Sequence, residues 1–191
     1  MCGAHVVDTK EKLTNWLSSI QNSFMVGMAA VFLFEHEDVW PLLKDAELGF
    51  VPEGAAFSPE NMSIRLPIHL VGERMQQEGL RPLLLKDFRE YLLRNTLSET
   101  LEHTREYCEA TSQMAKLNSA PWYHFARVIR NALTHDSRVR FDRLARPPLA
   151  FDRWRIESAH AGKHIADIGL ASTATVPLIV AIQEFVEQEL T

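Results

Sequence analysis

The sequence predicts a mainly α fold: an up-down bundle of four main helices, with a small β-hairpin between the third and the fourth. Two observations lead to this class. Apolar residues recur at three- and four-residue spacing in four separate segments, as expected for helices that bury one face. Prolines, glycines and short alternating segments interrupt this pattern between the helices. At 191 residues, with 46% hydrophobic and 24% charged residues, the chain fits one domain spanning residues 1–191.

The first predicted helix follows Asp8 or Thr9, either of which can cap it, and runs to about Glu37. Its most apolar stretch, residues 24–34, is eleven residues long, whereas a membrane span needs about 20. We therefore interpret that stretch as buried helix and expect no membrane contact. No signal peptide is visible at the start, and two cysteines make neither a disulfide framework nor a zinc site, so we expect a cytoplasmic protein.

An irregular connection at 45–80 precedes the second helix, which we place from near Leu83 to about Lys116. Within the connection, residues 63–70 alternate briefly between polar and apolar types, which indicates a short strand or an extended segment. Charged residues make up much of the exposed face expected for the second helix. These are Glu90, Arg94, Glu99, Glu102, Arg105, Glu106 and Glu109.

The third predicted helix starts after Asn118-Ser119-Ala120-Pro121, a polar cap followed by proline, and continues to about His135. Its apolar stripe is expected to face the core. The stripe consists of Trp122, Phe125, Ile129 and Leu133, with Ala126 and Ala132 alongside. Near the end of the same helix lies Arg130-Asn131, and Asn131 shares a helix face with His135 four residues later.

Residues 138–170 form an insertion with strand-like segments. We predict a hairpin that pairs 153–157 with 163–167. The last helix is predicted from Val176 to Leu190, with Thr175 as its cap and Pro177 in its first turn.

Arg130, Asn131 and His135 are the candidate catalytic residues. An arginine can stabilise the charge that develops on a phosphate, and histidine can transfer protons near neutral pH. The asparagine can orient either group or donate to a phosphate oxygen. A structural role is the alternative: an ion pair for Arg130, a loop contact for Asn131 and a helix-end hydrogen bond for His135.

Positive charge gathers in the same region. Residues 124–163 carry nine positive and four negative side chains, a net +5, while the rest of the chain carries −10. This favours a local RNA-binding surface, for which we select Arg127, Arg138 and Arg140 as backbone contacts. The alternative is that these arginines only solvate a loop and a hairpin. Trp122 and Tyr123 are candidates for stacking on bases, although Trp122 fits the core better.

The Arg130-Asn131-x-x-x-His135 motif, late in a helix of an all-helical domain, resembles the HEPN superfamily. That resemblance implies a HEPN-like bundle and a metal-independent endoribonuclease that cleaves RNA by attack of the 2′-hydroxyl. It also implies a homodimer with a composite site, no cofactor, and an antitoxin-type protein as a further partner. Other members keep the fold without turnover, so a non-catalytic RNA-binding or protein-interaction module is the alternative. His160 and His164 flank Gly162 in an expected turn, and we expect no metal.

Overall fold

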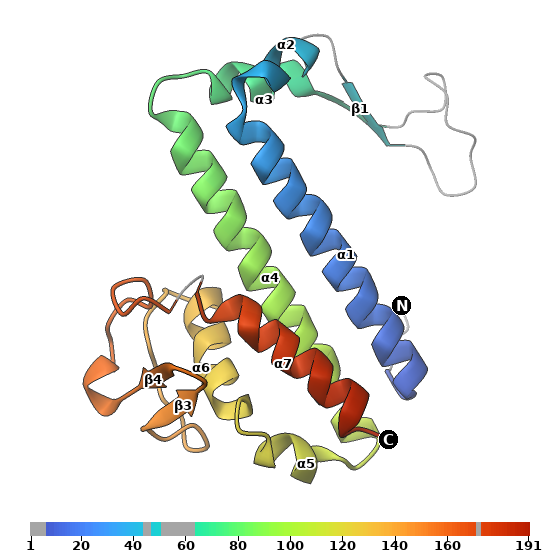
Figure 1. Cartoon of the computed structure of the whole chain (residues 1–191), viewed down its shortest axis with the longest axis vertical. Helices are drawn as coiled ribbons and strands as arrows, with labels where there is room; N and C mark the ends of the chain where they lie inside the picture. Colours follow the sequence, from blue (N-terminus) through green and yellow to red (C-terminus); the bar gives the residue numbers. More distant parts are fainter. Residues whose placement is uncertain (1–6, 44–46, 51–63, 171–172) are drawn as a thin grey trace. The chain divides into compact units, whose positions relative to one another are not determined.

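A computed structural model describes residues 7–43, 47–50, 64–170 and 173–191 (Figure 1), and these are mainly helical, as predicted. The long helices are α1 (Lys10–Glu35) and α4 (Leu80–Ala110), followed by α6 (Tyr123–Thr134) and α7 (Thr175–Gln188). Shorter helices are α2 (Trp40–Leu43), α3 (Ile68–Met75) and α5 (Met114–Ser119), with 3₁₀ turns η1 (Glu37–Val39) and η3 (Ser158–His160). Two antiparallel pairs join β1 (Glu47–Phe50) to β2 (Ile64–Pro67) and β3 (Leu149–Phe151) to β4 (Trp154–Ile156).

The chain divides into two compact units. The larger comprises residues 1–26 and 90–191, and the smaller comprises residues 27–89. The boundaries fall within α1 and within α4.

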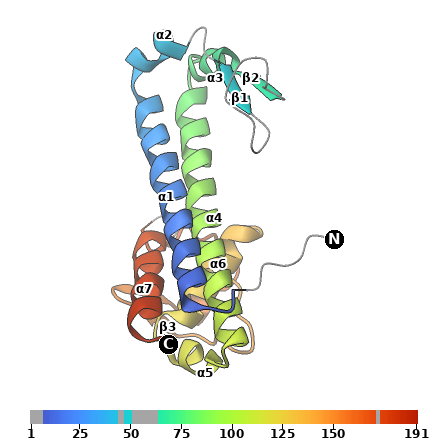
Figure 2. The same ribbon diagram turned by 90° about the vertical axis from the view of Figure 1, so that its right-hand side faces the viewer.

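The core of the larger unit joins side chains from all four main helices. Figure 2 shows α7 beside the first part of α1, where Lys10 donates to the Leu190 carbonyl at 2.6 Å and Gln183 donates to Gln21. The predicted stripe of α6 is confirmed as part of this core, with Leu133 partly buried at its edge. Other fully buried members are Leu13, Leu97, Leu178 and Ile182.

The ends of the helices depend on local hydrogen bonds, and the sequence patterns predicted only some of them correctly. Thr9 does cap α1, since its hydroxyl accepts a hydrogen bond from the Lys12 N–H at 3.2 Å. The second helix ends at Ala110, not near Lys116, because Ser112 adopts a positive φ of 58°. The Gln113 N–H then donates to the Cys108 carbonyl, which completes a Schellman motif.

Two other predicted caps are wrong. Asn118 and Ser119 belong to α5, and α6 begins after Trp122 without a side-chain cap. Thr175 lies inside α7, which begins after Ala174.

The hairpin is present between α6 and α7, but its predicted partner strand is wrong. Trp154–Ile156 pairs with Leu149–Phe151, which precedes it, across a tight turn in which Asp152 has a φ of 50°. Residues 163–167 form no strand and contribute one bridge, between Arg138 and His164. A capping box between Glu157 and His160 begins η3 and so ends the extended chain after β4.

The smaller unit confirms one expectation about the connection at 45–80. The segment at 63–70 contains strand β2, which pairs with β1 with Glu47 opposite Pro67. The chain then enters α3 directly. Ion pairs from Arg89 to Glu35, at 2.7 Å, and from Arg81 to Glu37, at 3.2 Å, link α4 with the end of α1 and η1 in this unit. Much of the predicted connection, at 51–63, lies outside the described residues.

The prediction that residues 24–34 are buried is wrong. Met25, Val26, Phe32 and Leu33 are each more than half exposed, while Val31 is buried. This part of the helix is apolar on most sides, and a helix that packs through one stripe leaves its other sides uncovered. By length and composition alone, α1 is also the one helix in the described part of the chain that suits a membrane span, and 17% of its most apolar window is buried.

Replacing Ile129 by alanine tests the core role assigned to α6. Ile129 is fully buried, so its truncation is expected to lower the free energy of unfolding by about 2–5 kcal/mol. Urea unfolding measures this. Leu144→Ala is the matched control, because Leu144 is 64% exposed and its loss should change stability by about 0.5 kcal/mol or less. Similar losses of unfolding free energy in both variants would contradict the assignment of Ile129 to the core.

Candidate functional site

A polar pocket of about 360 Å³ lies where α4 meets α6 in the larger unit. Leu101, Glu102 and Arg105 line it from α4. From α6 come Tyr123, Arg127, Arg130 and Asn131. Two residues of the predicted catalytic motif therefore share one pocket with a predicted RNA-binding residue, because α6 presents positions 123, 127, 130 and 131 on one side.

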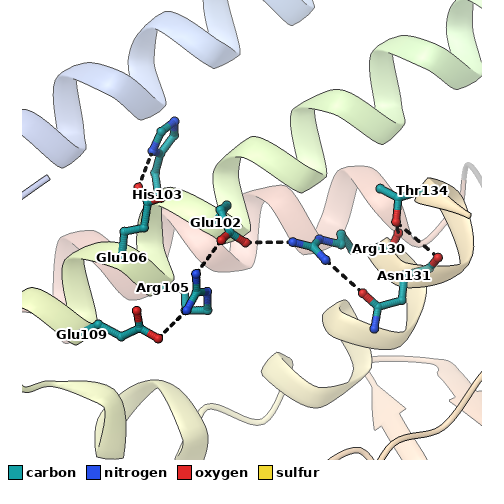
Figure 3. Close-up of polar contacts among 8 residues, drawn as sticks. All are labelled: Glu102, His103, Arg105, Glu106, Glu109, Arg130, Asn131 and Thr134. Atoms are coloured by element: carbon teal, nitrogen blue, oxygen red, sulfur yellow. Dashed lines mark hydrogen bonds and ion pairs between the residues drawn. The ribbon is translucent and has the colours of Figure 1, made fainter. Parts of the chain in front are cut away.

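Arg130 is held by two partners within this pocket (Figure 3). One terminal nitrogen donates to the Glu102 carboxylate at 2.8 Å and the other donates to the Asn131 side-chain oxygen at 3.1 Å. Its Nε is buried and has no hydrogen-bond partner among the residues that the structure describes. An unsatisfied buried donor costs roughly 1–3 kcal/mol, so an acceptor that reached this Nε–H would bind favourably.

Glu102 is a residue of this site that the sequence analysis placed on an exposed face. It accepts from Arg105 at 2.5 Å and from Arg130, so one carboxylate bridges α4 and α6 (Figure 3). The hydrogen bond from Arg105 is the largest contribution lowering the pKa of Glu102; burial opposes it, and the charges of Arg105 and Arg130 assist it. Glu102 is therefore ionised at neutral pH. Its spacing from Arg105 is visible in the sequence, but the contact across helices is not.

Arg127 lies one helical turn before Arg130. It pairs with Asp142 at 2.5 Å, and its guanidinium lies 5.8 Å from the centre of the Tyr123 ring. One terminal nitrogen, Nη1, is buried and donates to no group in the described ranges. Burial raises the pKa of Asp142, but hydrogen bonds from the Ala145 and Leu144 N–H groups and the Arg127 charge outweigh it, so the net pKa is lowered.

His135 does not line the pocket. It follows the last residue of α6 with φ −110° and ψ −106°, and its N–H donates to the Asn131 carbonyl at 3.2 Å. Its side chain is exposed and makes no hydrogen bond to any described residue. The imidazole is therefore not among the groups that line the pocket with Arg130 and Asn131.

The other two predicted RNA-binding residues lie in the loop after α6, outside the pocket. Arg138 donates to the Gly162 carbonyl at 2.7 Å, and Arg140 pairs with Asp136. Both remain exposed. Six exposed positive side chains of the basic segment have no ion pair among the described residues: Arg138, Arg143, Arg146, Arg153, Arg155 and Lys163.

The predicted stacking residues are buried. Trp122 and Tyr123 are each 4% exposed, and their rings meet edge to face, so neither presents an open face to a base. Burial confirms the core placement preferred for Trp122 and leaves Tyr123 no open ring face for stacking in this conformation.

Other chemically capable side chains have local roles. Burial raises the pKa of the Cys108 thiol to about 11, which keeps it protonated at neutral pH. His160 and His164 each accept a hydrogen bond from a nearby backbone N–H, of Glu157 and Ala166 respectively. Within the described ranges, no three His, Cys, Asp or Glu residues are grouped to hold a metal ion.

Replacing Asp142 by asparagine tests the anchoring of Arg127. Because the folded-state pKa of Asp142 is lowered, its carboxylate stabilises the fold above about pH 4, and this contribution disappears as pH falls through the folded-state pKa. We expect Asp142→Asn to cost about 1 kcal/mol at pH 7. Urea unfolding of both proteins at pH 7 and pH 3 measures the difference, and a difference that does not shrink at pH 3 would contradict this assignment.

Comparison with known proteins returns no match: no protein-family model, no curated protein and no solved structure matches this chain.

Proposed function

We propose that this protein is a HEPN-type, metal-independent endoribonuclease acting as a homodimer. The observation that carries the proposal is that Arg130 and Asn131 line a pocket rich in arginine, with an exposed histidine at the end of the same helix. Together, arginine, amide and imidazole side chains can stabilise the charge, orient the groups and transfer the protons in RNA cleavage through the 2′-hydroxyl.

The proposed reaction begins when a base removes the proton of a 2′-hydroxyl, whose oxygen then attacks the adjacent phosphorus. The P–O bond to the 5′-oxygen breaks, and an acid protonates that oxygen, which leaves a 2′,3′-cyclic phosphate and a 5′-hydroxyl. His135 supplies acid or base catalysis, and Arg130 stabilises the added negative charge on the phosphate. Asn131 already contacts the Arg130 guanidinium and orients it.

Dimerisation supplies what one chain lacks. The reaction moves two protons, but each chain brings a single histidine of the motif, and that histidine lies outside its own pocket. In a two-fold dimer, each His135 can approach the partner's arginine pocket, so that the composite site holds two histidines and two arginines. An antitoxin-type protein that covers this site would be the corresponding regulatory partner.

The alternative function is a non-catalytic helical module that binds RNA or a protein. The ion pair between Glu102 and Arg130 favours it, because it partly neutralises the arginine that catalysis needs. The exposed cations of residues 138–163 that form no ion pair with a described residue suit RNA binding without turnover.

Incubation of the protein with labelled structured RNA in excess chelator tests the proposal. We expect chelator-resistant cleavage, products that end in 2′,3′-cyclic phosphate, and a particle mass equal to two chains. Products with a 3′-hydroxyl would exclude this mechanism. RNA binding without cleavage by a folded dimer would favour the non-catalytic module.

A further inference from the structure

Two guanidinium donors of residues that line the pocket have no partner within the described part of the chain. They are Arg130 Nε and Arg127 Nη1, both buried and three residues apart on α6. Both residues line the same pocket. Buried donors in folded proteins are nearly always satisfied by protein groups, water or a ligand, so this pair marks the pocket as a place where a polar group can bind.

The positive charge of the pocket favours an anionic group. Arg105, Arg127 and Arg130 supply three cations, and their guanidinium groups favour the tetrahedral oxygens of phosphate through paired N–H donors. The acidic side chains that now hold them are Glu102, Glu109 and Asp142. Of these, only Glu102 lines the pocket, and it contacts two of the three arginines.

We propose that the α4–α6 pocket binds a phosphate group of RNA and that Glu102 occupies this site as an internal anion until the phosphate displaces it. The identity of the ligand as RNA rests on the proposed function. The expected affinity of the pocket for phosphate rests on its arginines and does not depend on that function. Glu102 shares its carboxylate between Arg105 and Arg130. When it withdraws, Arg130 keeps its contact with Asn131 and Arg105 keeps its ion pair with Glu109, but each guanidinium group has a terminal nitrogen available for the ligand. Rotation of the Arg130 side chain then lets its covered Nε reach the ligand, while Arg127 stays paired with Asp142.

The exchange makes Glu102 a positioning residue that sets phosphate affinity. Its side chain is about one-third exposed, so it lies at the mouth of the site and can move towards solvent without leaving a buried charge behind. Removing its charge should therefore strengthen phosphate binding, whereas removing an arginine should abolish it.

The test is calorimetric titration of inorganic phosphate, and separately of a short single-stranded oligoribonucleotide, at constant ionic strength. We expect Glu102→Gln to bind both about tenfold more tightly than the unmodified protein, which corresponds to about 1.4 kcal/mol. Arg127→Gln and Arg130→Gln should lose phosphate binding. Glu99→Gln is the matched control, since it removes the same charge from an exposed position one turn earlier on α4.

An equal gain in Glu99→Gln and Glu102→Gln would overturn the proposal, because the effect would then be one of net charge. Phosphate binding that survives Arg130→Gln, or no binding by any of these proteins, would also overturn it. Tighter binding of the oligonucleotide alone would assign the site to the RNA backbone, whereas tighter binding of inorganic phosphate alone would assign it to free phosphate and contradict the proposal.

A second measurement needs no variant. Nitrogen-15 NMR of the arginine side chains in the unmodified protein should show the Arg130 and Arg127 Nε–H signals shift on addition of phosphate but not of equal chloride. Unmoved signals at saturating phosphate would overturn the proposal. Neither readout requires turnover: phosphate binding without RNA cleavage would end the nuclease proposal and leave this one standing, and cleavage without the Glu102 effect would do the reverse.

Discussion

Replacing His135 by alanine is expected to lower the rate of chelator-resistant RNA cleavage by about 10²–10⁴-fold, the usual contribution of a general acid or base. RNA affinity should change little, because the imidazole lies outside the arginine pocket and makes no hydrogen bond to the described part of the chain. Single-turnover cleavage and filter binding, measured on the same RNA, separate the two quantities.

His124 provides the matched control for this experiment. It lies in the first turn of the same helix, away from the motif. We expect His124→Ala to retain cleavage. Equal losses in both variants would indicate a general disturbance of α6, and unchanged cleavage by His135→Ala would remove His135 from the proposed reaction.

Arg130→Ala is expected to reduce cleavage by about 10²–10³-fold, since it removes a preorganised donor to the charge that develops on phosphate. RNA binding should also weaken, because the same side chain contacts the phosphate before reaction. The variant should fold, because the Arg130–Glu102 pair is about one-third exposed and such pairs contribute about 0–1 kcal/mol. Cleavage kinetics and thermal unfolding of the same sample measure both effects.

Two further variants, Arg130→Lys and Arg94→Ala, test whether the effect depends on charge alone and on this arginine in particular. Arg130→Lys keeps the charge but loses the fork of donors that reaches Glu102 and Asn131 together, so we expect only partial recovery. Arg94 belongs to a second Arg-Asn pair, on α4, where it lies over the Tyr91 ring. Arg94→Ala should cleave normally. Full activity of Arg130→Lys would show that charge alone suffices.

Local patterns predicted the helices well wherever one stripe of side chains is buried. The positions from Phe125 to Ala132 in α6 are an example: apolar residues at helical spacing must lie on one side, and this side meets the core. The same reasoning failed for residues 24–34 of α1, because an apolar sequence does not specify how much of its surface another element will cover.

The partner strand of residues 154–156 could not be predicted from composition and periodicity. Residues 149–151 and 163–167 are both plausible partners for 154–156 by composition. The outcome depends on Asp152, which adopts a positive φ in a tight turn, and on the capping box that folds residues 157–160 into a 3₁₀ turn. These backbone choices depend on hydrogen bonds that side-chain periodicity does not report.

By itself, the sequence determined the mainly helical class and the core face of α6, since both depend on the spacing of apolar residues along helices. Only the tertiary structure decided that Glu102 of α4 pairs with Arg130, that Arg127 shares the pocket and that His135 lies outside it. The physical reason is that an ion pair between helices depends on how the helices pack, and the side chains that meet across that contact are 28 residues apart in the chain.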